Sequence, residues 1–376
     1  MTRWTLSLLL ILAISRSAVA NGSGQIIVDK TQLETSPLQN RTFEEEIVPQ
    51  HYANHPGINA FINDMVAKYD LDAKTLKTLF NQAAYSKTAI KLTLSASKST
   101  LKSWQAYQAR LIEPLRINAG VKFWQQSKAA LQRASKEFGV PPEVIVGIIG
   151  VETLYGRNMG NFRVLDTLTT LAFDYPETHN RAQRMALFRK NLEDFLLWTQ
   201  NAGIEPRTVL GSYSGAIGIP QFLPSSIVKY AVDYKGNHRI DLRNSPDDAI
   251  GSVANYLKQH GWNSGRPVAW RIHEDAGSIG IAQAATNGSP EPRWALQKLL
   301  RAGMLLNENS VDIISEAKTP VAVIELPTPE QPTQYILGLR NFYVLTYYNH
   351  SFFYALAAYQ LGERVRAQME KSSSIQ

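Results

Sequence analysis

The side chain best suited to acid–base chemistry in this sequence is a carboxylate at the end of an apolar segment. Residues 140–156 open with Pro141 and Pro142, which suit the first turn of a helix because a missing N–H costs nothing there. Residues 144–151 carry no polar side chain, so the predicted helix is apolar all round and must be buried. Glu152 follows this run directly.

Two interpretations of Glu152 are open from this helix alone. The carboxylate could be paired with a cation such as Arg157 and serve only the structure. Alternatively, it could lie in a poorly solvated pocket, where desolvation favours the protonated form and makes the group a general acid near neutral pH.

A second unusual stretch, residues 211–226, reads GSYSGAIGIPQFLPSS. Its three glycines and two prolines exclude a long regular element. Small residues also let backbone amides approach a ligand closely. We therefore expect an irregular loop at a binding site.

The elements that must position these residues are mainly helical. Apolar residues recur at helical spacing from Pro56 onward, and Asp72 is a predicted N-cap. We also predict short strands at 268–270 and 321–325. Further helices are predicted at 120–138, from 165 to about 174, and at 181–201, 247–260, 294–302 and 351–369, with one more beginning near Ser225.

The N-terminus has the features of an export signal. A basic start precedes an apolar run over residues 4–14 and a small-x-small site at residues 18–20, so we expect a cleaved signal peptide over 1–20. No later segment approaches the roughly 20 apolar residues that span a bilayer. The chain has no cysteine, which excludes disulfides and a lipid-modified cysteine. These features predict a soluble periplasmic protein without a membrane anchor.

Charge and motif content exclude several other classes. The net charge of +7 suits an anionic polymer, but no basic run is long enough to indicate nucleic acid. The seven histidines form no HExxH pattern, which argues against a catalytic zinc site. Ser212 and Ser214 lie in no GxSxG elbow, which argues against a serine hydrolase.

Four long motifs resemble those of one enzyme family. The segments VPPEVIVGIIGVETLYGRNMG, SGAIGIPQFLPSS, DAIGSVANYLKQHGW and NFYVLTYYNHS are similar, in this order, to motifs of the lytic murein transglycosylases of the B type. The resemblance runs from about Gly120 to Gly362.

This resemblance implies a mainly α fold with a lysozyme-like catalytic core, a helical flanking domain and a small mixed or β subdomain. The predicted division is a signal peptide (1–20), a flexible lead (21–42), the helical domain (43–140), the catalytic core (141–263), the small subdomain (264–330) and a C-terminal segment and helix (331–370) that packs back on the helical domain and core.

The resemblance also implies the chemistry, which is cleavage of the MurNAc–GlcNAc bond of peptidoglycan without water. Most glycosidases need two carboxylates, whereas members of this family use one. By resemblance, Glu152 protonates the glycosidic oxygen, and the substrate's own N-acetyl group stabilises the cationic centre. Glu152 then takes the proton from the 6-hydroxyl, which closes a 1,6-anhydro ring.

Several other residues match family positions. The resemblance implies that Ser212 and Gln221 line the sugar site and that Tyr256, Tyr348 and Asn349 lie near the cleavage point. Arg184 would contact the anionic peptide stem, although a solvated helix arginine is an alternative. For Gln221 the alternative is a loop residue that satisfies its own backbone, and for the tyrosines it is core packing.

Some relatives carry a calcium loop after the Gln-Phe motif. In this chain Asp233, Asn237 and Asp248 could supply oxygens. An EF-hand, however, wants an oxygen at the third position and glycine at the sixth, where this chain has Lys235 and His238. The loop is therefore either a calcium site or simply a charged loop, and we expect no other cofactor.

Two alternatives to the transglycosylase remain open. One is a hydrolase on the same scaffold, with Asp174 as the nearest candidate for a second carboxylate. The other is a non-catalytic peptidoglycan-binding protein, which would not need a buried Glu152. The expected partners are peptidoglycan glycan strands and proteins of cell-wall synthesis or division.

Overall fold

The structure is a computed structural model that describes residues 47–48, 52–97, 103–307 and 313–373. The predicted signal peptide (1–20) and flexible lead (21–42) lie outside the described residues. Within the described part, the chain is mainly helical, as predicted. No helix in these ranges is both long and apolar enough to cross a membrane. The helices are α1 (Pro56–Tyr69), α2 (Ala73–Asn81), α3 (Lys87–Ser97), α4 (Trp104–Leu111), α5 (Pro114–Gln126), α6 (Lys128–Phe138), α7 (Pro142–Thr153), α8 (Val164–Phe173), α9 (Arg181–Asn201), the 3-10 turn η1 (Pro206–Thr208), α10 (Pro224–Tyr230), α11 (Pro246–Gln259), α12 (Ala276–Ala285), α13 (Leu296–Arg301), α14 (Ile313–Glu316), α15 (Arg340–Tyr348) and α16 (Phe352–Ser373).

The strands form two small antiparallel pairs and one larger sheet. Strand β1 pairs with β2, strand β3 pairs with β4, and the larger sheet has the order β5-β8-β7-β6 with antiparallel neighbours throughout. Strand β8 lies beyond residue 330, where the sequence placed the end of the small subdomain. The strands are β1 (Ile47–Val48), β2 (Tyr85–Ser86), β3 (Phe162–Arg163), β4 (Leu210–Gly211), β5 (Ala269–Arg271), β6 (Trp294–Ala295), β7 (Pro320–Leu326) and β8 (Gln334–Gly338).

The single long helix predicted over 120–138 is wrong, because the chain breaks at Ser127 into α5 and α6. Ser127 has φ −108° and ψ 20°, outside the helical region, and makes no side-chain cap. Serine competes for backbone hydrogen bonds and is a poor residue for a helix interior. The break lets α6 leave the line of α5 and pack against α11 and α7.

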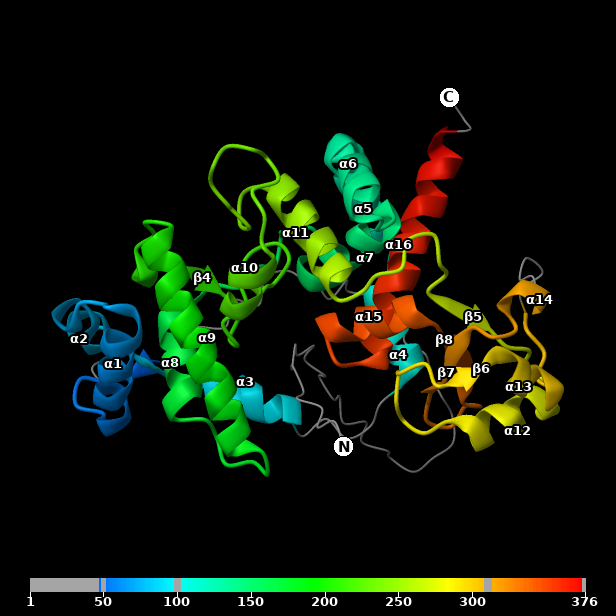
Figure 1. The fold of residues 1–376 in the computed structure, drawn as a ribbon, viewed down its shortest axis with the longest axis horizontal. Helices are drawn as coiled ribbons and strands as arrows, with labels where there is room; N and C mark the ends of the chain where they lie inside the picture. The colour runs from blue at the N-terminus through cyan, green and yellow to red at the C-terminus, as the bar shows by residue number, and fades with distance from the viewer. Residues whose placement is uncertain (1–46, 49–51, 98–102, 308–312, 374–376) are drawn as a thin grey trace, which may run out of the picture.

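The larger sheet separates two hydrophobic cores. Alternate residues of a strand point to opposite faces, and β7 follows this rule. Val321 and Val323 pack with the helices α12 and α13 in a small core, whereas Ala322 and Ile324 belong to the main core. Figure 1 shows the sheet between α12 and α13 on one side and α15 and α16 on the other. The small subdomain is therefore a helix-covered sheet attached to a helical body.

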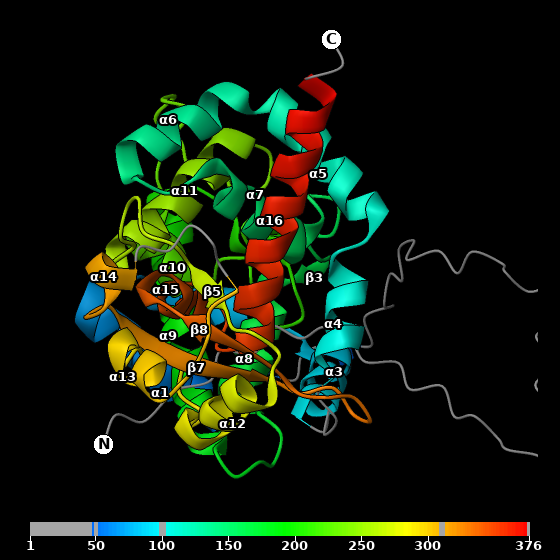
Figure 2. The ribbon, with the colours of Figure 1, turned by 90° about the vertical axis from the view of Figure 1, so that its right-hand side faces the viewer.

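The most extensive contact between two helices of the described residues is between α7 and α16, which run side by side in Figure 2. A Cβ added at Gly147 would lie 2.0 Å from the carbonyl oxygen of Ala358, and one at Gly362 would lie 2.0 Å from that of Glu143. Only glycine allows such an approach of two backbones. These two glycines set the distance between α16 and the helix that carries Glu152.

Candidate active site

Glu152 lies in the last turn of α7, and the chain turns sharply just after it. Leu154, Tyr155 and Gly156 have φ values of 50°, 59° and 86°, three consecutive residues in the left-handed region. Two of them are not glycine, so the turn is strained by an amount on the order of 1–3 kcal/mol per residue. The Thr153 hydroxyl holds the turn, donating to the Ile219 carbonyl at 2.9 Å and accepting from the Gly156 N–H at 2.9 Å. The end of α7 is thereby fixed to the loop 211–226.

The carboxylate of Glu152 has one hydrogen-bond donor from the opposing helix. The Tyr354 hydroxyl on α16 donates to Glu152 Oε1 at 2.5 Å. Glu152 keeps partial exposure while its neighbours Val151 and Thr153 are buried. Burial raises the pKa of Glu152 to about 8, and the Tyr354 hydrogen bond acts in the opposite direction without cancelling it. Glu152 is therefore protonated at neutral pH and held by a donor that also stabilises its ionised form.

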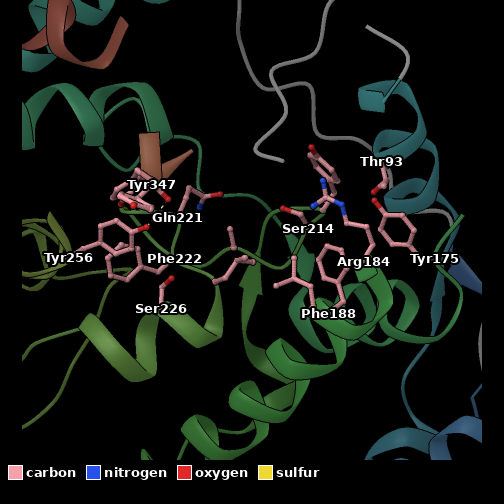
Figure 3. Close-up of a pocket in the computed structure, with 15 residues that line it drawn as sticks. Thr93, Tyr175, Arg184, Phe188, Ser214, Gln221, Phe222, Ser226, Tyr256 and Tyr347 are labelled. Carbon is pink, nitrogen blue, oxygen red and sulfur yellow. Dashed lines mark hydrogen bonds between the residues drawn. The ribbon is translucent and has the colours of Figure 1, made fainter. Parts of the chain in front are cut away.

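A cavity runs between α9, the loop 211–226 and α15, as Figure 3 shows. Glu152 is not in its lining, but the charge of Glu152 acts on Tyr256 and Tyr348, which are. In Figure 3 one end carries Tyr256 and Tyr347, and the other carries Arg184 and Tyr175. Tyr348 also lines the cavity, with its ring 4.9 Å from that of Tyr256. Among the described residues that line this cleft, none is Asp or Glu. Asp174, the nearest candidate for a second carboxylate under the hydrolase alternative, accepts a hydrogen bond from the Tyr52 hydroxyl at 2.8 Å and is not in the lining.

At the tyrosine end, the hydroxyls of Tyr256 and Tyr348 each donate a hydrogen bond to a backbone carbonyl. Tyr256 donates to the carbonyl of Tyr347 at 2.7 Å, and Tyr348 donates to that of Pro220 at 2.6 Å. Burial, together with the nearby Glu152 charge, raises the pKa of both hydroxyls. The Tyr348 ring stacks on that of Tyr354 with centroids 6.2 Å apart. The two predicted tyrosines therefore form a wall next to the Glu152–Tyr354 pair.

The loop 211–226 supplies the floor of the cleft. The Gln221 amide nitrogen donates to the carbonyls of Gly218 at 2.9 Å and Met159 at 3.3 Å, so it braces the loop from within the lining. The Ser212 hydroxyl accepts the Ala216 N–H at 3.0 Å and lies 3.1 Å from that of Ser214. Ser214, which the sequence reasoning did not single out, lines the cavity. Ser212 thus shapes the turn behind it, and its contact with a substrate stays a prediction.

At the far end of the cleft, Arg184 is a buried cation. Its side chain is only 7% exposed, and it has no hydrogen bond or ion pair with a carboxylate among the residues that the structure describes. Burial lowers the pKa of its guanidinium. A buried cation without a counter-charge costs several kcal/mol unless something pairs with it. The alternative of a solvated helix arginine does not fit this burial.

Two further residues need comment. Asn349, predicted near the cleavage point, is buried at the C-terminal end of α15, outside the cavity lining. Tyr354 is the functional residue that sequence reasoning missed. Its partner lies 202 positions away. The signal that could have found it is the pair of glycines, Gly147 and Gly362, one on each helix.

In the loop that could hold calcium, the carboxylate oxygens already accept hydrogen bonds from backbone N–H groups of the same loop. Asp233 accepts the N–H groups of Gly236 at 2.7 Å, Asn237 at 3.1 Å and His238 at 2.6 Å. Asp248 accepts those of residues 234, 235 and 241 at 2.8–2.9 Å. No group of three or more acidic or histidine side chains is placed to hold a metal within the described ranges. Because these oxygens face N–H donors and Lys235 brings a positive charge, the residues present do not fit a resident calcium ion.

Comparisons with known proteins agree on one family. A family model described as a transglycosylase SLT domain matches residues 53–363. The membrane-bound lytic murein transglycosylase B of Escherichia coli strain K12 is 38% identical over 333 residues, which cover 84% of this chain and 87% of that protein.

Two of the solved structures that resemble this one illustrate the match. The Escherichia coli lytic transglycosylase Slt35 in complex with calcium is 36% identical, with a TM-score of 0.74, and the match covers 86% of this chain and 96% of that one. SltB3 from Pseudomonas aeruginosa in complex with NAG-NAM-pentapeptide is 27% identical, with a TM-score of 0.69, over 82% of this chain and 79% of that one.

Proposed function

This chain belongs to the transglycosylase SLT family, and we propose that it cleaves the β-1,4 MurNAc–GlcNAc bond without water through Glu152 alone. It is a lytic transglycosylase that acts on peptidoglycan, and its mainly helical fold has a lysozyme-like core. The observation that carries the one-carboxylate mechanism is the buried Glu152 carboxyl, with its pKa raised to about 8, next to the tyrosine end of a cleft whose described lining contains no Asp or Glu.

In the first step, Glu152 acts as a general acid. It gives its proton to the glycosidic oxygen, the bond from C1 of MurNAc to that oxygen breaks, and GlcNAc leaves with a hydroxyl. A pKa near the working pH is what an efficient general acid needs. The Tyr354 hydrogen bond then favours the carboxylate that this step leaves behind.

In the second step, the same carboxylate acts as a base. The substrate's N-acetyl group holds the cationic C1 in the meantime. Glu152 takes the proton of the 6-hydroxyl, whose oxygen attacks C1 and closes the 1,6-anhydro ring. The proton returns to Glu152, so the enzyme is restored and no water is consumed.

We assign different parts of the substrate to the two ends of the cleft. We assign the sugars at the cleavage point to Gln221, Tyr256 and Tyr348, with Ser212 and Asn349 shaping the walls around them. We assign the acidic peptide stem to Arg184, because a buried guanidinium without a protein carboxylate attracts an anion. The NAG-NAM-pentapeptide bound by SltB3 has such a stem and supports this assignment.

The remaining proposals concern the surroundings of the enzyme. The N-terminal signal favours export to the periplasm, and glycan strands are the proposed partner, with proteins of cell-wall synthesis or division as further candidates. Slt35 was solved with calcium, but we propose that the loop 233–248 of this chain holds its shape by hydrogen bonds and needs no ion.

Mass analysis of the products released from purified peptidoglycan tests the reaction. The expected products carry 1,6-anhydroMurNAc ends, and Glu152→Gln lowers the rate roughly 10²- to 10⁴-fold, the range typical of a lost general acid. Products one water heavier, with reducible ends, would mean a hydrolase. A Glu152→Gln variant that releases products as fast as the parent would remove Glu152 from the mechanism.

A further inference from the structure

A second cavity lies at the N-terminal end of α15, beside Leu339, Arg340 and Tyr343. Its walls come from the linker between α11 and β5, from the start of β7 and from α15 itself. We propose that this cavity, the distal groove, binds saccharide units of the same glycan strand beyond those in the cleft. This inference rests on the proposed function. The groove is defined by Asn263, Arg266, Glu291, Pro292, Thr319 and Tyr343.

A row of aromatic rings connects the two cavities. Tyr347 lines the cleft and Tyr343 lines the distal groove, one helical turn earlier on α15. Their ring centroids are 5.0 Å apart. The row continues to His260, 5.2 Å from Tyr347, and to Tyr256, stacked 4.1 Å from His260. A strand that leaves the cleft past Tyr347 meets Tyr343 next.

The tyrosine of the groove is held in place and partly exposed. Arg340 lies over the Tyr343 ring, 5.5 Å from its centroid. The same guanidinium donates to the carbonyls of His260 at 3.0 Å and Gly261 at 3.4 Å, which fixes the cation. Tyr343 keeps partial exposure. A ring fixed in this way offers a flat apolar surface at low entropic cost to the C–H face of a pyranose.

The charges and size of the groove suit a neutral polymer. Arg266 is paired with Glu316, and Glu291 is paired with Arg293, whereas Arg340 bonds only backbone carbonyls and lies over the Tyr343 ring. Pro267 also lines the groove. Like the other prolines of the groove, it is rigid and has no N–H to donate. The volume is about 380 Å³, within the range of ligand sites. Amide and hydroxyl groups beside an aromatic ring that carries a cation on one side match a hydroxyl-rich glycan, which hydrogen-bonds to such groups and packs its C–H face on the ring.

The groove also gives the small subdomain a role. Glu291 and Pro292, before β6, and Thr319, before β7, belong to the subdomain, whereas Asn263 and Tyr343 belong to the helical body. Figure 1 shows α15 between α10 and the sheet, so the sheet extends the binding surface away from the cleft. The backbone of Asn263 is fixed by Asn341, whose side chain bonds its N–H at 2.7 Å and its carbonyl at 2.9 Å.

Glycan strands of graded length and without peptide stems test the proposal. The quantity measured is kcat/KM for long strands divided by kcat/KM for short ones. Tyr343→Ala is expected to lower this ratio about five- to tenfold, the effect of one aromatic contact, whereas Tyr343→Phe keeps it. Asn263→Ala, which changes a groove residue from the linker between α11 and β5, is expected to lower it about threefold.

Two outcomes would overturn the proposal. One is a ratio that stays at the parental value in both Tyr343→Ala and Asn263→Ala. Another is a drop seen only with strands that carry stems, which would make the groove a peptide site.

Binding by the Glu152→Gln protein separates this test from the proposed function. Tighter binding of long strands than of short ones, reduced by Tyr343→Ala, supports the groove even if the parent protein releases no product. Binding that is independent of strand length contradicts the groove whatever the reaction proves to be.

Discussion

The two ends of the catalytic cleft bury polar groups in opposite ways. At one end, Glu152 accepts a bond from Tyr354, and the hydroxyls of Tyr256 and Tyr348 are each closed on a backbone carbonyl. At the other end, Arg184 is as buried as Tyr256 and Tyr348 but has no carboxylate beside it among the described residues.

This difference suits the Glu152 end to proton transfer and the Arg184 end to ligand recognition. A buried acid that keeps its proton is neutral at rest, so its end of the cleft is complete without substrate. A buried guanidinium stays charged and lacks its counter-charge until a ligand supplies one. The first end is prepared for proton transfer, whereas the second spends folding stability on affinity for an anion.

The largest expected effect concerns the stability cost of Glu152. Its pKa is about 8 in the folded protein against 4.5 for the free side chain. Between these values the unfolded chain ionises while the folded one keeps its proton, so the parent loses stability as the pH rises. Glu152→Gln does not titrate, so its free energy of unfolding at pH 8 should exceed that of the parent by on the order of 4 kcal/mol. Unfolding at pH 4 and pH 8 measures this, and a difference independent of pH would contradict it.

At the other end of the cleft, Arg184→Met should raise stability and lower affinity together. Methionine fills similar space without a charge, so the unpaired buried cation is removed. With strands that carry stems, kcat/KM should fall roughly ten- to a hundredfold, the value of a bond between charged groups. Stem-free strands are the control. A variant that is less stable than the parent would show that Arg184 has a structural partner.

A smaller effect is expected from Tyr354→Phe. Its hydroxyl lowers the pKa of Glu152, so its loss should move the alkaline limit of activity to higher pH. The rate should fall about tenfold, because one hydrogen bond to the ionised carboxylate is lost. Tyr348→Phe is the matched control, since that hydroxyl bonds the Pro220 carbonyl instead. An equal shift of the pH limit in both variants would argue against a specific Tyr354–Glu152 bond.

The smallest effect should come from removing divalent ions. The loop 233–248 lies outside the cleft and is closed by bonds from backbone N–H groups to Asp233 and Asp248. We therefore expect a chelator to leave the melting temperature unchanged. A drop of several degrees, restored by calcium, would show that the loop binds the ion after all.

Local sequence patterns predicted individual helices and caps better than the contacts between distant segments. The buried α7 with Glu152 at its end, the Asp72 cap and the bounds of α9 follow from periodicity and cap residues, and the structure confirms them. The Tyr354 partner does not, because it depends on how closely α7 and α16 approach. The isolation of Arg184 likewise depends on which residues are absent around it.

The elements that were missed have a similar explanation. The break at Ser127 follows from where α6 packs, not from a strong breaker in the sequence. Strand β8 was missed because it lies in a stretch that was read as leading into the C-terminal helix. It becomes a strand by pairing with both β5 and β7.

The dependence of kcat/KM on pH tests the central claim most directly. If one carboxylate is first acid and then base, only its protonated form starts the reaction. The profile should then be flat at low pH and fall with an apparent pKa of about 8, because of Glu152. A bell-shaped profile, with a second limb in the range of an ordinary carboxylate, would show that another acid takes part and would contradict the mechanism.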